Sequence, residues 1–122
     1  MTREFTTYNQ ALALKELGYN EPCLAWYVSK DYGLEIGKVI QTDLIKDAIV
    51  APTFHQAFKW FREKYNRLHT VNIDLSNNLK DKVFIYTIED HLGSIVDRSE
   101  EYKTYEEAES ACLNKLIEMI KS

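Results

Sequence analysis

Residues 51–65 read APTFHQAFKWFREKY, and this segment contains the clearest helix signal in the chain. Pro52 suits the first turn of a helix, and Thr53 with Gln56 matches the pattern of a capping box. At about 100° per residue, the large aromatic residues share one face, with Ala57 and Leu68 alongside. These aromatic residues are Phe54, Phe58, Phe61 and Tyr65. We therefore expect a helix whose aromatic face is part of the core.

The part of the chain before this helix is predicted to form one helix and two strands. The expected elements are a helix over about residues 8–17, a strand over 23–28 and a strand over about 34–40. Thr6 or Thr7 can cap the helix, and Gly18 can end it in the left-handed conformation. The first strand is indicated by an apolar run rich in aromatic and β-branched residues. Residues 42–50 show no readable pattern.

The part after the middle helix is predicted to form strands followed by a last helix. The expected strands cover residues 70–75, 83–89 and 94–98. Thr104 and Glu107 form a capping box, and the acidic residues of that turn lie at the positive end of the helix dipole. The expected core face of this helix consists of Tyr105, Ala108, Cys112, Leu116 and Met119.

These elements follow the order αββαβββα, with no internal repeat and no linker that would separate a second domain. We therefore predict one domain over residues 1–122, of the α+β class. Its expected core is a single sheet of about four to five mostly antiparallel strands packed with three helices. An α-β-α sandwich, with helices on both faces of that sheet, also fits this order.

Composition narrows the classes of function. The chain has 122 residues, 45% of them hydrophobic, and 15 Lys and Arg against 19 Asp and Glu give a net charge of −4. This balance argues against broad non-specific binding to nucleic acid, while a local basic patch is still allowed. The sequence shows no signal-peptide pattern, and its longest purely hydrophobic run, residues 23–28, is too short to span a bilayer. We expect a cytoplasmic protein that makes no membrane contact.

Residues suited to catalysis or metal binding are not grouped in the sequence. His55, His69 and His91 lack the spacing of a metal site, and no Gly-rich phosphate loop is present. Cys23 and Cys112 fall in apolar segments, where we expect reduced, buried and unreactive thiols. The sequence therefore predicts a protein that is not an enzyme, with no cofactor and no metal.

Charge is distributed unevenly along the chain. The middle helix carries most of a basic cluster, whereas residues 89–109 contain eight acidic residues and only two of Lys and Arg, namely Arg98 and Lys103. Because Arg and Trp are favoured at interface hot spots, we expect a partner-binding surface in the middle helix. The residues assigned to it are Lys59, Trp60, Arg62, Lys64 and Arg67. An ordinary solvated helix rim is the alternative interpretation, and the acidic segment is a second candidate contact surface.

Three blocks of the sequence resemble a family of small proteins encoded by phages and prophages of Bacteroides-type bacteria. The blocks are residues 11–23 (ALALKELGYNEPC), residues 51–65, and residues 102–117 around TYEEAE at 104–109. The order of helices and strands also resembles small phage domains with helices on both faces of a sheet. The family supplies no activity and no site residue that could be transferred to this chain.

The resemblance to phage proteins implies a function in binding a host partner. By its size and apparent source, the chain is similar to inhibitors of type VI-B CRISPR effectors, which are RNA-guided RNases. We therefore expect a non-enzymatic anti-CRISPR protein that binds and inhibits a host protein or ribonucleoprotein complex. Two alternatives stay open: a phage accessory protein that binds RNA or single-stranded DNA through the basic middle helix, and a structural or assembly component of the virion.

Overall fold

The computed structural model describes residues 4–27, 34–40, 49–74 and 83–121. It has three helices and two small antiparallel sheets, so the predicted α+β class is confirmed. The helices are α1 (Tyr8–Glu16), α2 (Phe54–Tyr65) and α3 (Tyr105–Lys121). The strands are β1 (Cys23–Tyr27), β2 (Leu34–Ile40), β3 (Ile49–Val50), β4 (Leu68–Ile73), β5 (Phe84–Glu89) and β6 (Ile95–Arg98).

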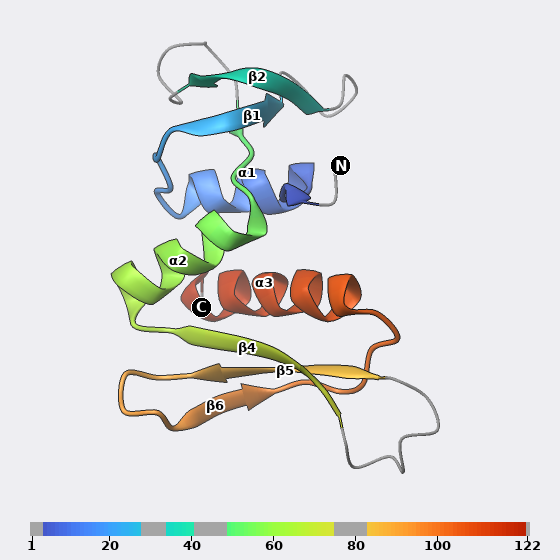
Figure 1. Cartoon of the computed structure of the whole chain (residues 1–122). Helices are drawn as coiled ribbons and strands as arrows, with labels where there is room; N and C mark the ends of the chain where they lie inside the picture. Colours follow the sequence, from blue (N-terminus) through green and yellow to red (C-terminus); the bar gives the residue numbers. More distant parts are fainter. Residues whose placement is uncertain (1–3, 28–33, 41–48, 75–82, 122) are drawn as a thin grey trace.

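The helices form a layer between the two sheets (Figure 1). The sheet of β1, β2 and β3 lies beside α1, and the sheet of β4, β5 and β6 lies against α3 (Figure 1). The three helices all start at the same end of the molecule (Figure 1). This shared direction brings segments that are far apart in sequence to one edge of the helix layer.

Backbone hydrogen bonds join the segments that enter α1 and α2. Phe5 and Thr53 form an isolated antiparallel bridge, and the Thr6 N–H donates to the Pro52 carbonyl oxygen at 2.9 Å. The Tyr27 hydroxyl of β1 donates to the Thr6 carbonyl oxygen at 2.8 Å. The starts of the two helices and the first sheet are therefore held together.

The second sheet buries one face against the helices. β5 is its central strand, and β4 and β6 pair with it in antiparallel register. Tyr86 and Ile88 of β5 are buried in the core, with Val71 of β4 packed beside them. The alternate positions of β4, such as Thr70, are exposed, as expected for a sheet with one solvated face.

Each helix begins at a threonine whose hydroxyl accepts a backbone hydrogen bond. At α1, the Gln10 N–H donates to Thr7 Oγ1 at 3.2 Å, and the Thr7 N–H donates to Gln10 Oε1 at 3.0 Å. The same reciprocal capping box joins Thr53 and Gln56 at α2. These bonds satisfy amide groups that a helix start leaves unpaired, and they confirm Thr7 and Thr53 as caps.

The main core lies where α2 meets α3. Phe61 is completely buried there, and the α3 residues beside it continue the core toward β5. The buried α3 residues are Ala108, Cys112, Leu113, Leu116 and Ile117. A polar contact joins α1 to α3, because Gln10 Nε2 donates to Ser110 Oγ at 3.0 Å and to Asn114 Oδ1 at 3.0 Å.

The predicted single sheet is wrong, because the strands on either side of α2 form separate sheets. The α-β-α sandwich is wrong for the same reason, since the sheets flank the helices. The order is αβββαβββα, and the added strand β3 lies in the segment without a readable pattern. Three helices between two sheets cover one face of each, so neither sheet needs helices on both sides.

Two residues assigned to helix core faces are more exposed than predicted. Leu68 belongs to β4 and is 40% exposed, because Asn66 ends α2 in the left-handed conformation and the chain turns away. Tyr105 is 41% exposed, since it is the first residue of α3 and only touches Phe84 edge-on, with ring centroids 6.2 Å apart. The remaining residues of that predicted face are buried or packed against the core.

Replacing Phe61 with alanine should lower the free energy of unfolding by about 3–5 kcal/mol, because a completely buried phenylalanine leaves a cavity. Urea unfolding followed by circular dichroism measures the change. Leu92→Ala, at an exposed turn position, is the matched control and should cost well under about 1 kcal/mol. Equal losses in the two variants would contradict the assignment of Phe61 to the core.

Candidate functional site

The five residues predicted to bind a partner differ in how far they are exposed. Lys59, Arg62 and Lys64 are exposed on α2, while Trp60 is only 8% exposed. Arg67 is half-buried after the helix, where its guanidinium donates to the Tyr65 carbonyl oxygen at 3.4 Å. The exposed cations are therefore available to a partner, whereas Trp60 is mainly a core residue.

Trp60 is buried because the chain after α1 covers its side of α2. Tyr19 meets the Trp60 ring edge-on at 5.4 Å, and Tyr65 does so from the helix end at 5.4 Å. The Lys64 ammonium lies 4.9 Å from the centre of the Trp60 ring, a cation–π contact. The edge of Trp60 and the neighbouring Lys59 line a small pocket of about 240 Å³.

Positive groups gather on the opposite side of α2. The His69 ring of β4 stacks on Phe58, with centroids 3.6 Å apart and planes 10° apart. Burial, followed by the charges of Arg62 and His55, lowers the pKa of His69 to about 4. Arg62 forms no ion pair with another described residue. This side of α2 therefore carries exposed basic side chains, with Glu63 of the same helix exposed beside Arg62.

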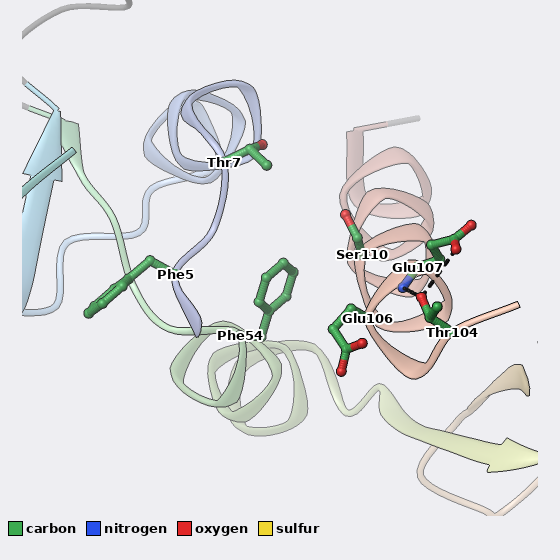
Figure 2. Close-up of a pocket in the computed structure, with 7 residues that line it drawn as sticks. All are labelled: Phe5, Thr7, Phe54, Thr104, Glu106, Glu107 and Ser110. Atoms are coloured by element: carbon green, nitrogen blue, oxygen red, sulfur yellow. Dashed lines mark hydrogen bonds between the residues drawn. The ribbon is translucent and has the colours of Figure 1, made fainter. Parts of the chain in front are cut away.

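A groove opens at the end of the molecule where the three helices start. We call it the helix-start groove, and Figure 2 shows seven of the residues that line it. It consists of two adjoining hollows of about 520 and 470 Å³ that share Phe54 and Glu106. The first is also lined by Phe5, Thr7, Thr104, Glu107 and Ser110, and the second by Glu4, Thr53, His55, Tyr105 and Glu109.

The shape of the helix-start groove follows from the helix caps. Phe54, the first residue of α2, projects into the space between α1 and α3, and Glu106 projects toward it from α3 (Figure 2). The Thr104 hydroxyl accepts a hydrogen bond from the Glu107 N–H at 3.1 Å. This bond caps the start of α3 at the rim of the groove. The groove therefore has an aromatic floor and an acidic rim.

The acidic segment 89–109 is divided among three places. Glu106, Glu107 and Glu109 line the helix-start groove. Asp90 lies in the turn between β5 and β6, where the backbone N–H groups of Ser94 and Leu92 lower its pKa. Asp97 lies on β6, and burial, followed by the effect of this carboxylate, raises the pKa of Tyr86. The segment is therefore not one continuous acidic surface.

The two cysteines are free and buried, as predicted. Burial raises the pKa of Cys23 to about 11 and raises that of Cys112 further. Both thiols therefore stay protonated near neutral pH, which makes them weak nucleophiles.

His69 should make folding stability depend on pH. The folded chain keeps His69 neutral down to about pH 4, whereas the unfolded chain takes up a proton near the ordinary value of 6.5. Lowering the pH from about 7 to about 5 therefore favours the unfolded state. Over this pH range the free energy of unfolding should fall by roughly 1 kcal/mol more in the wild type than in His69→Phe, a figure that allows for the partial exposure of His69. The His69→Phe variant keeps a ring against Phe58. Urea unfolding at both pH values tests this, and equal losses would contradict the lowered pKa.

No group of three or more His, Cys, Asp or Glu in the described ranges could hold a metal ion. Of the helices described, none has the length and apolar character needed to cross a bilayer. No protein-family model, curated protein or solved structure matches the chain.

Proposed function

We propose that this chain is a non-enzymatic phage or prophage protein that binds and inhibits a ribonucleoprotein complex of host defence. The proposed target is an RNA-guided RNase of the type VI-B class in the cytoplasm of the bacterial host. The proposed contact is the basic face of α2, defined by His55, Lys59 and Arg62. The resemblance to phage proteins motivates this choice of target.

The observation that carries the proposal is the pair of exposed cations on this face of α2. Lys59 and Arg62 are exposed, and neither is in an ion pair with another described residue. Burial, followed by the charges of Arg62 and His55, lowers the pKa of His69, and these three basic side chains therefore lie close together. Such a face is complementary to phosphates or carboxylates on a ribonucleoprotein surface.

A second property supports a ribonucleoprotein as the partner. The helix-start groove is acidic at its rim and shares His55 with the basic face of α2. The chain therefore presents charges of both signs on adjacent surfaces. A ribonucleoprotein also presents both signs, on its RNA and on the basic protein residues that hold the RNA.

The purified RNase, loaded with its guide RNA, should cleave target RNA more slowly when this protein is present at micromolar concentration. Lys59→Glu with Arg62→Glu should weaken the inhibition by at least about tenfold, because two attractive charges become repulsive. A fluorescent RNA-cleavage assay measures both effects.

Lys15→Glu with Lys103→Glu is the matched control, since both lysines are exposed elsewhere and the change in net charge is the same. This control should inhibit as the wild type does. Undiminished cleavage in the presence of the wild-type protein would overturn the proposed function. An equal loss of inhibition in the two double variants would show that α2 is not the contact surface.

Direct binding of RNA or single-stranded DNA is the second candidate function, favoured by the same exposed cations, Lys59 and Arg62. On this account a labelled single-stranded RNA should bind without any effector present. Its affinity should fall steeply between roughly 50 and 200 mM salt, because phosphate contacts release counterions. Lys59→Glu with Arg62→Glu should abolish the complex.

Fluorescence anisotropy measures this binding and its salt dependence. No change in anisotropy at low salt would reject the second candidate function. Binding that is independent of salt would also reject it, since the proposed contact is electrostatic.

A further inference from the structure

The helix-start groove has the features of a site for a side chain that combines an apolar stem with a positive end. Phe54 occupies its floor, and Tyr105 adds aromatic surface at the second hollow, whereas the Phe5 ring points away from the groove (Figure 2). Tyr105 is an exposed aromatic residue that lines the second hollow. Its ring is therefore accessible to a ligand in that hollow. Aromatic rings favour both aliphatic stems and cations.

The charges at the rim are negative and incompletely balanced. Four glutamates line the two hollows, and His55 is the one basic side chain among the lining residues. Glu106 and Glu107 lie in the first turn of α3, where the helix dipole stabilises them. Glu109 lies beyond that turn, and the dipole effect falls off within the first turn. Burial and the nearby charge of Glu106 raise the pKa of Glu109, and a cation placed beside the two carboxylates would offset their mutual repulsion.

An anionic ligand does not fit the same groove, although three helices start there. The Gln10, Gln56 and Glu107 N–H groups, which an anion would need, already donate to threonine hydroxyls. The glutamates would also repel an anion. The groove therefore selects positive charge, and a nucleic-acid phosphate is the wrong occupant.

We propose that the helix-start groove binds a lysine- or arginine-bearing segment of a partner protein. The aliphatic stem lies against Phe54 and Tyr105, and the cationic end lies between Glu106 and Glu109. The two hollows are large enough for one such side chain and its neighbours, because both volumes fall within the range of roughly 300–1,000 Å³ that is usual for small-ligand pockets. The site is separate from Lys59 and Arg62, and it does not depend on which complex is the partner.

The probe is a short peptide of alternating leucine and lysine, added to the ¹⁵N-labelled full chain and followed by two-dimensional NMR. Saturable shifts are expected for the amides of residues 4–7, 53–56 and 104–110. Glu106→Gln with Glu109→Gln should weaken binding about tenfold, because two attractive charges are lost. The same peptide with glutamate in place of lysine should not bind.

Glu16→Gln with Glu21→Gln is the matched control, since both residues are exposed, lie outside the groove and change net charge equally. Circular dichroism establishes that both double variants are folded. The proposal is overturned if the groove variant binds as the wild type does, if the glutamate peptide binds equally well, or if the shifts map to another surface. Because no RNase is used, this result is distinct from failure of the proposed inhibition.

Discussion

Phe61 is completely buried where α2 meets α3, and the two sheets depend on this contact because both need the helix layer to cover them. Tyr86 and Ile88 of β5 pack on one side of that layer, while Leu14, Cys23 and Val50 belong to the same core on the other. A small three-stranded sheet with one solvated face has little stability of its own. The aromatic face of α2 therefore stabilises the halves of the chain on both sides of it.

The same packing arranges the surface. Because the helices run in one direction, three caps and the glutamates of α3 meet at the helix-start groove. The outer face of α2 is left uncovered, so Lys59 and Arg62 stay exposed beside that acidic groove. Opposite charges on adjacent surfaces suit a partner that carries both signs. The two proposed contacts can be tested separately, because Lys59 and Arg62 line neither hollow of the groove.

Much of the local structure could be predicted from sequence. The starts of α1 and α2 follow from reciprocal bonds between residues three positions apart, such as Thr53 and Gln56, and these bonds need no distant partner. Trp60 shows why the predicted site was less successful. Its position on the helix wheel is off the aromatic face, yet Tyr19 from a separate segment covers it. A helix wheel contains no information about a neighbour that arrives from elsewhere in the chain.

The sequence by itself determined the α+β class, the helix caps, the aromatic face of α2 and the exposed cations of that helix, because these depend on residue type and short spacing. Only the tertiary structure decided that the strands form two sheets, that Trp60 is buried and that Glu106 and Glu109 face Phe54 across a groove. Those outcomes depend on contacts between residues far apart in sequence. These contacts form because three helices must cover two apolar sheet faces at once. A local sequence pattern does not show how the helices are arranged to do so.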